Sequence, residues 1–324
     1  MNKNIVMFRI LDLAPVILLI ILLGVFAALD PRIVSGQNLM QILINTAPVA
    51  ILALGAMVVL IAGGIDLSAG YGVALCSVIF ASFLTNEGSL VMAVVFALLT
   101  GVLIGLFNGF FIGLFNVQPF IVTLSSMTII QGATLVVATS GTLMITNPVL
   151  KTLGIGTTGV IPNILILTFL LLAIIYVLVY HTNFGLWTYG LGSSAESSES
   201  SGVPIARQQI LVYLFSGVCT ALTAMLLVSR VTIVSPNIGG ISILLDAITA
   251  TVIGGTSIYG GKGSIWGTLV GALIISLITN ALVVFGISSS SLDLFKGAII
   301  IGALAIDSGI RYAKSNLSSG GETA

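Results

Sequence analysis

The stretch SLVMAVVFALLTGVLIGLFNGFFIGL, residues 89–114, decides the fold class of this chain. It belongs to an uncharged region, residues 88–150, that lies between Glu87 and Lys151. A helix needs about 20 mainly apolar residues to cross a bilayer. The apolar residues do not alternate with polar ones as they do in the strands of membrane β-barrels. Because backbone groups in lipid must hydrogen-bond within their own segment, the stretch predicts a transmembrane helix.

The composition of the whole chain agrees with this prediction. Of its 324 residues, 57% are hydrophobic and 6% are charged, whereas about 25% of the residues of a soluble domain are charged. Such a chain cannot cover a surface that faces water, so membrane lipid must be its main solvent. Ten basic and ten acidic residues balance, which gives no indication of nucleic-acid binding. Cys76 and Cys219 lie in apolar runs and are interpreted as small membrane hydrophobes rather than a disulfide.

Apolar runs of spanning length recur along the sequence. We therefore predict an all-α integral membrane protein in which residues 1–324 form one transmembrane domain, a single bundle of about ten helices. The expected spans are residues 13–29, 46–62, 68–85, 89–114, 119–138, 162–180, 207–228, 243–259, 265–285 and 293–311. The tail, residues 313–324, is expected to be disordered.

The basic residues predict the orientation of this bundle, because cytoplasmic loops are enriched in lysine and arginine. With ten spans and the N-terminus inside, the cytoplasmic side receives Lys3, Arg9, Arg207, Lys262, Arg311 and Lys314. The outer side receives only Arg32, Lys151 and Arg230, and Lys296 falls near or within the last span. Both termini are therefore expected in the cytoplasm.

Glycines recur every four residues in the fourth span. They are Gly101, Gly105, Gly109 and Gly113. This spacing places them on one helix face, where the lack of side chains lets a neighbouring helix come close. Two interpretations stay open: tight helix packing, or a surface along which helices slide during a conformational change.

Polar residues interrupt the apolar sequence at AGGIDLSAGYG, residues 62–72. One interpretation is a tight turn at the cytoplasmic end of a span, in which Asp66 accepts bonds from local backbone N–H groups. The other is a contact with a substrate or a gate, because a carboxylate inside a membrane is expensive and often functional. The candidate residues here are Gly63, Gly64, Asp66, Ser68 and, near the outer end of the second span, Asn45.

A second interruption, LLDAITATVIGGTSIYGGKGSIWG, covers residues 244–267. Its candidate translocation or gating residues are Asp246, Gly254, Gly255 and Thr256. The glycine-rich turn before Lys262 is not a phosphate-binding loop, because that pattern requires glycine at 256 and a hydroxyl residue at 263. The glycine pairs at 63–64 and 254–255 both end an apolar run, which suggests a short internal repeat of the kind found in transporters.

Residues capable of covalent or metal chemistry are scarce. The only histidine, His181, follows the sixth span, so neither a Ser–His–Asp triad nor a zinc site can be argued. We predict no metal, no cofactor and no catalytic residue in this chain. Ion-coupled transport stays open, although Asp66, Asp246 and Lys296 all lie nearer to predicted span ends than to midplane.

The serine-rich stretch GSSAESSESSG, residues 192–202, is the most polar part of the chain. Ser193 and Glu196 fit the capping box that begins a helix. Gly202 suits the left-handed position after a helix, and Pro204 blocks continuation. The stretch therefore predicts a helix over about residues 194–201, too short to be stable alone in water. Either another protein packs on it, or it is a solvated polar loop.

Five segments together resemble a known family, the permease subunits of ribose-type ATP-binding-cassette (ABC) importers of bacteria. They are GGIDLSAG, NVQPFIVTLSSMTIIQG, HTNFGLWTYGLGSSAESSESSGV, LDAITATVIGGTSIYGGKGSIWGTLVGALI and FKGAIIIGALAID. The resemblance covers about residues 40–310 and implies a multi-pass protein of the inner membrane. It implies pairing with a second permease copy or a paralogue, two ATPase subunits inside, which hold the ATP and magnesium, and a sugar-loaded binding protein outside. The substrate would be a ribose-type sugar, a nucleoside or a signalling furanose.

The resemblance also implies a role for the serine-rich stretch. Residues 187–206 are similar to the family's coupling segment, whose short helix fits a groove on the ATPase. The implied coupling residues are Ser193, Ser194, Ala195, Glu196, Ser197, Ser198, Glu199, Ser201 and Gly202. The chain departs from the family there, because Ser194 replaces an asparagine and Ser197 and Ser198 replace two alanines. Leu244 also stands where the family commonly has glutamate.

Overall fold

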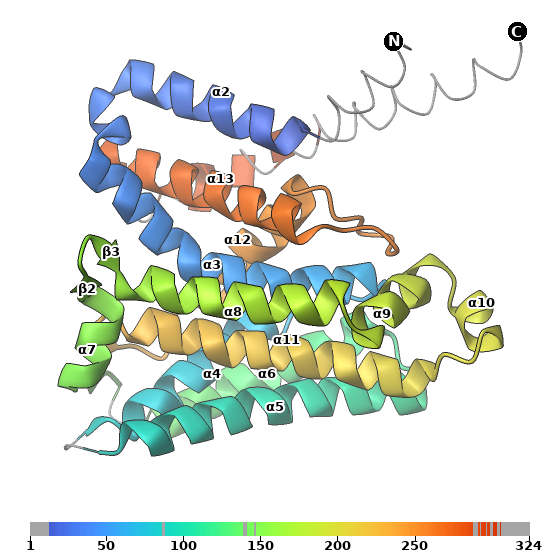
Figure 1. Ribbon diagram of the computed structural model, residues 1–324. Helices are drawn as coiled ribbons and strands as arrows, with labels where there is room; N and C mark the ends of the chain where they lie inside the picture. The colour runs from blue at the N-terminus through green and yellow to red at the C-terminus, as the bar shows by residue number, and fades with distance from the viewer. Residues whose placement is uncertain are drawn as a thin grey trace, which may run out of the picture.

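A computed structural model of the chain (Figure 1) shows a bundle of helices. It describes residues 13–85, 88–138, 141–145 and 147–287, and beyond these only positions 291, 293–295, 297–298, 301–302 and 305. The tail 313–324 and most of the expected span 293–311 lie outside the described residues.

Six helices of this described part are long and apolar enough to cross a membrane. They are α3 (Gly36–Ile61), α5 (Leu90–Phe115), α6 (Pro119–Val137), α8 (Asn163–Tyr180), α11 (Ile205–Val228) and α13 (Ile265–Val284). Serine side chains cap the N-termini of α3, α5 and α13 by accepting bonds from backbone N–H groups, which satisfies donors that the first turn of a helix leaves free. These six helices agree with predicted spans to within a few residues, except that α3 begins ten positions earlier than the predicted 46–62.

Three further apolar helices are shorter: α2 (Ala14–Leu29), α4 (Ala69–Ser82) and α12 (Gly240–Ile253). α4 and α12 have 14 residues each, or about 21 Å, against a hydrocarbon core of about 30 Å. The predicted spans 68–85 and 243–259 are therefore wrong in length. In both regions apolar residues continue beyond the helix into non-helical backbone, so a count of apolar residues cannot locate the ends of the helix.

The short helices α4 and α12 begin side by side inside the bundle. A Cβ on Gly70, in the first turn of α4, would overlap the carbonyl oxygen of Gly240, the first residue of α12. Gly72 lies against Thr220, near the middle of α11. From there the two helices run to opposite ends, since Phe80 of α4 packs with Val228 at the end of α11, whereas α12 ends beside Gly267 at the start of α13.

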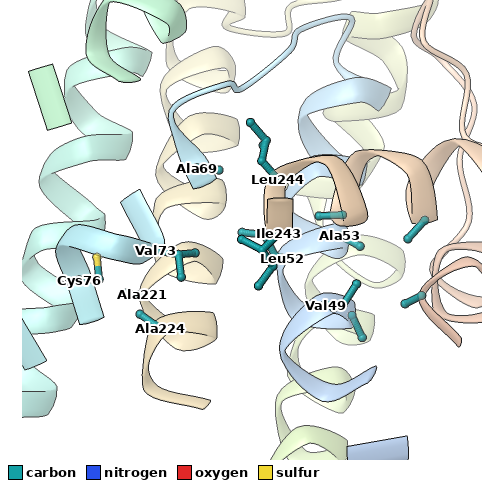
Figure 2. Close-up of a cluster of buried hydrophobic side chains, with 14 of the residues drawn as sticks. Val49, Leu52, Ala53, Ala69, Val73, Cys76, Ala221, Ala224, Ile243 and Leu244 are labelled. Carbon is teal, nitrogen blue, oxygen red and sulfur yellow. The ribbon is translucent and has the colours of Figure 1, made fainter. Parts of the chain in front are cut away.

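The core of the bundle lies where α3, α4, α11 and α12 meet, and Figure 2 shows part of it. Its labelled residues are Val49, Leu52, Ala53, Ala69, Val73, Cys76, Ala221, Ala224, Ile243 and Leu244. By contrast, large apolar side chains on α5, α6 and α8 are exposed, as expected of helix faces that contact lipid. Cys76 and Cys219 are buried and free.

The remaining elements lie at the two ends of the bundle. One end carries α9 (Asn183–Ser193) and α10 (Ala195–Ser200), and the other carries α7 (Pro148–Ile155) with β2 (Thr157–Thr158) and β3 (Ile161–Pro162) (Figure 1). We call these the α10 end and the α7 end. Strand β1 (Leu143–Met144) pairs antiparallel with β4 (Ile233–Val234), and β2 pairs antiparallel with β3. Apart from these two-residue strands and the 3₁₀ helix η1 (Pro31–Val34), the described elements are α-helices.

Candidate coupling surface and buried polar network

The serine-rich stretch forms two helices at the α10 end rather than a loop. α9 ends at Ser193, whose hydroxyl donates to the carbonyl oxygen of Tyr189 at 2.8 Å. The side chain of Ser194 accepts from the N–H of Ser197 at 3.2 Å and so caps α10. The prediction that Ser193 is the cap is wrong by one residue, because α9 continues through Ser193 and uses it as its last residue.

Helix α10 is terminated by Gly202, the glycine that the sequence predicts for this role. Gly202 has a φ of +84°, a conformation that glycine adopts without strain. The N–H of Gly202 donates to the carbonyl of Glu199 at 2.9 Å and that of Val203 to the carbonyl of Ser198 at 3.0 Å. These two bonds form a Schellman motif. α10 therefore has a defined start and end within the chain itself.

A groove of about 450 Å³ lies between α9 and α10. Hydroxyl residues line most of it: Ser193, Ser194, Ser197, Ser198 and Ser201. Leu186, Trp187 and Val203 form its apolar part. Glu196, Glu199 and Ala195 are exposed on α10, so all the predicted coupling residues gather on this one projecting surface.

The base of this surface is packed tightly against two other elements. A Cβ on Gly192 would overlap the carbonyl oxygen of Ile61, the last residue of α3, which accepts a bond from the N–H of Gly261 at 2.9 Å. Gly260, at a φ of +92°, lies against Gly192, and the hydroxyl of Tyr189 donates to the carbonyl of Gly263 at 2.9 Å. We call this contact between α9, the end of α3 and the turn 254–263 the glycine junction.

A second polar site lies inside the bundle around Asp66. One oxygen of its carboxylate accepts from the N–H and the hydroxyl of Ser68, at 3.0 and 2.6 Å. The other accepts from the hydroxyl of Ser216 on α11, at 2.7 Å. The amide of Asn108 on α5 donates to Ser68 at 2.8 Å and accepts from Ser126 on α6 at 2.5 Å. This buried polar network joins the loop before α4 to α5, α6 and α11.

Asp66 accepts the predicted bond from a local backbone N–H group, that of Ser68, but it does not lie at the end of a span as predicted, and its contact with a substrate or a gate stays a prediction. Its side chain lies beside Ser216, at the middle of α11, and not at an end of the bundle. The reason is the glycine pair: Gly63, at a φ of +82°, closes a Schellman motif after α3, and the chain then turns back into the bundle. Gly64 lies in close contact with Tyr213, since a Cβ added to Gly64 would overlap the hydroxyl oxygen of Tyr213.

The other candidates of the second interruption are spread along α12 and its end. Asp246 is buried in α12. Gly255, at a φ of +90°, ends α12 with a Schellman motif like that of Gly63, so the two glycine pairs have the same structural role. Gly254 lies against Gly267, and Thr256 against Gly263 of the junction.

Asn45 belongs to neither site. It lies inside α3, where it accepts bonds from Gln41 at 3.1 Å and from Arg230, at the end of α11, at 2.9 Å. Arg230 also reaches the carbonyl of Ile44 at 3.4 Å. Because α3 rises about 1.5 Å per residue, Asn45 is more than one membrane leaflet away from the glycine pair that follows Ile61.

The glycine ladder of α5 faces α11. Gly101 lies against Gly217, Gly105 against the carbonyl of Tyr213, Gly109 against Ile210 and Gly113 against Ala206. Each added Cβ would come within 2.7 Å of a backbone atom of α11, which no real Cβ tolerates. The two helices are in backbone contact along this row.

Several residues of both sites were not among the candidates. In the network they are Asn108, Ser126 and Ser216, and in the groove Leu186, Trp187 and Val203. A signal existed for Asn108, the one amide in the apolar run 89–114, because such a group requires partners inside a membrane. No such signal singles out Ser126, which follows Ser125, or Ser216, which shares its span with Thr220 and Thr223. Trp187 lies within the predicted coupling segment, but the sequence alone does not indicate which way its ring points.

Fold and sites together define a multi-pass helical membrane protein with a projecting hydroxyl-rich surface at one end. Within the described residues no group of His, Cys, Asp and Glu could hold a metal ion. The chain belongs to the family of permease components of the branched-chain amino acid transport system type, whose model matches residues 38–304. A permease component is a transporter subunit that catalyses no reaction and needs no cofactor of its own.

Curated relatives cover most of the chain. It is 35% identical to ribose import permease protein RbsC of Bacillus subtilis over 91% of this chain and 92% of that protein. It is 34% identical to RbsC of Escherichia coli, over 90% and 92%, and 28% identical to the D-allose transport system permease protein AlsC of the same species, over 90% and 89%. These relatives confirm the resemblance to bacterial ABC importer permeases. No solved structure gives a significant match to the chain.

Proposed function

We propose that this chain forms one half of the membrane pathway of a bacterial ABC importer for a small sugar of the ribose type. The names of the relatives at 34–35% identity support this substrate class. A nucleoside or a signalling furanose is the alternative cargo. The second half would be another copy of the chain or a paralogue, and an extracytoplasmic binding protein would deliver the substrate. The α10 end and both chain termini would face the cytoplasm of the inner membrane.

The observation that carries the proposal is the surface formed by α9 and α10. It projects from the bundle (Figure 1), and most of the exposed residues of α10 are serine or glutamate. A helix of six residues is unstable in isolation, yet here both of its ends are satisfied by the chain. Such a preformed surface can bind an ATPase subunit without the loss of conformational entropy that ordering a flexible segment would cause.

The glycine junction provides a route from this surface into the bundle. Movement of α10 with the ATPase would displace Gly192, which contacts the end of α3 and the turn after α12. The buried polar network begins a few residues after that end of α3. A shift between two arrangements of these elements, each favoured by a different state of the ATPase, would change access to the pathway.

Reconstituted vesicles test this function. We expect uptake of labelled ribose-type sugars only when the ATPase, ATP inside and the binding protein are all present. Ser197→Arg would place a bulky charge on the coupling surface and is expected to abolish substrate-stimulated ATP hydrolysis, while membrane insertion stays normal. Ser200→Ala, on α10 but outside the groove lining, is the control and should retain stimulation.

Two results would contradict the proposal. Normal stimulation of ATP hydrolysis in the Ser197→Arg variant would show that this surface does not contact the ATPase. Uptake that depends on an ion gradient and not on any ATPase would instead indicate a secondary carrier.

A further inference from the structure

The groove between α9 and α10 offers hydrogen-bond acceptors and few donors. A serine hydroxyl has one hydrogen to donate and two lone pairs. Ser193 donates its hydrogen to Tyr189 and Ser201 donates to the carbonyl of Ser197, both at 2.8 Å. Ser194 donates to the hydroxyl of Ser197 at 3.0 Å. Three hydroxyl hydrogens are therefore used within the chain, and these serines present lone pairs to any partner.

The charged residues beside the groove also favour a partner that donates hydrogen bonds. Glu196 and Glu199 are exposed on α10, and a carboxylate is an acceptor only. Neither glutamate forms an ion pair, since Arg32–Asp30 is the one salt bridge among the described residues. Arg207 and Lys262 lie on neighbouring elements, but neither lines the groove. The surface is complementary to a cation that carries several donors.

The apolar part of the groove narrows the choice of cation. Trp187 lines it, together with Leu186, which is 68% exposed. A guanidinium is planar, stacks on aromatic rings and carries five donors in a fixed fork, whereas an ammonium is a compact and strongly hydrated charge. An arginine can thus stack its planar group on Trp187 while it donates to several serine oxygens, whereas a lysine carries three donors but no planar group that stacks.

We infer that this groove binds an arginine side chain of the ATPase subunit, held by the serine oxygens and Trp187 and attracted by Glu196 and Glu199. The inference rests on the proposed function and adds the chemistry of the contact. It also explains the departures from the family: Ser197 and Ser198 add oxygen atoms where alanines would offer only methyl groups, and Ser194 replaces an asparagine, whose amide would add two donors.

Fluorescence of Trp187 tests the inference directly. The chain has two tryptophans, so a Trp266→Phe background leaves Trp187 as the only one. Permease in nanodiscs is titrated with its purified ATPase subunit, and binding is followed both by Trp187 emission and by an independent affinity measurement. We expect binding to change the emission of Trp187, and Glu196→Gln with Glu199→Gln to weaken the affinity at least tenfold at low salt. Ser200→Ala, on α10 but outside the groove, is the matched control and should bind as the parent does.

Substitutions in the ATPase identify the occupant. Each exposed arginine is replaced in turn by lysine and by leucine, and variants are kept if their ATP hydrolysis without permease is intact. We expect one arginine whose Arg→Lys variant loses at least tenfold in affinity and no longer changes Trp187 emission. Unchanged Trp187 emission and affinity in every variant would overturn the inference but leave the proposed function standing. An Arg→Lys variant that binds as well as the parent, at the position where Arg→Leu fails, would overturn the choice of a guanidinium. If the parent ATPase does not bind at all, both the inference and the proposed function fail.

Discussion

Tyr213 is buried, with 2% of its surface exposed, and its hydroxyl has no hydrogen-bond partner. That hydroxyl lies against Gly64, the second glycine of the pair that turns the chain back into the bundle. We expect Gly64→Ala to lower stability by about 1–3 kcal/mol, the usual effect of overpacking a filled core. Tyr213→Phe alone should be nearly neutral, since it removes an unpartnered group.

The double variant Gly64→Ala/Tyr213→Phe distinguishes this explanation from a general intolerance of the turn. Loss of the hydroxyl makes room for the new methyl group, so the double variant should melt at a higher temperature than Gly64→Ala alone. Thermal unfolding in detergent measures both. A double variant no more stable than Gly64→Ala would show that Tyr213 is not the obstacle.

Ser216 donates to the buried carboxyl group of Asp66 at 2.7 Å, and a buried acceptor that loses its donor costs about 1–3 kcal/mol. Ser216→Ala leaves a carboxyl oxygen without this donor, so we expect a loss of stability in that range. The matched control is Ser125→Ala on α6, because Ser125 is exposed and its hydroxyl donates only to the carbonyl of Ile121 within its own helix. Equal melting temperatures for the two variants would contradict a structural role of the network.

Residue-level predictions from the sequence succeeded where the cause is local. Gly202 ends α10 as predicted because a Schellman motif depends on one glycine and its neighbours. The cap was misplaced by one residue, since Ser193 and Ser194 are chemically equal and only the length of α9 decides between them. The depth of Asp66 could not be predicted, because it depends on partners 150 residues away in sequence, such as Ser216.

At the scale of elements, α5 and α11 are held together without intervening side chains. Gly105 lies against the carbonyl of Tyr213, so Gly105→Ala must push the helices apart. We expect a loss of about 1–3 kcal/mol, measured as a lower melting temperature. Gly132→Ala on α6 is the control, since nothing lies within 4 Å of its added Cβ and alanine is the better helix former by about 1 kcal/mol. A Gly105→Ala variant as stable as Gly132→Ala would show that the row of glycines is not a tight contact.

The long helices were predictable, and the short ones were not. Composition and length alone identify α5, α8 and α11, because each is a continuous apolar run of spanning length. α4 and α12 are equally apolar but stop at 14 residues. Their ends depend on the loops 62–68 and 254–263, which make contacts with segments far away in the sequence, such as Asp66 with Ser216 and the N–H of Gly261 with the carbonyl of Ile61. Discontinuous helices of this kind are characteristic of transporter cores.

At the scale of the whole molecule, the two ends should face opposite sides of the membrane. Cys76 and Cys219 are buried, at 0% and 1% exposure, so introduced cysteines can be labelled selectively. We expect a membrane-impermeant maleimide to label Ser200→Cys, at the α10 end, only in inside-out vesicles. Val160→Cys, 87% exposed at the α7 end, should be labelled only in right-side-out vesicles. Labelling of Ser200→Cys from the outside would exclude contact with a cytoplasmic ATPase.

The glycine junction has a mechanical consequence. Where Gly192 meets Ile61 and Gly260, main chain touches main chain, and no rotatable side chain lies between them to absorb strain. A displacement of α10 would therefore move the end of α3 and the turn 254–263 as whole segments, because little deformation can occur at the contact itself. The stiffness of this one contact, rather than the affinity of the ATPase for α10, would then determine how far a movement of the ATPase displaces the centre of the protein.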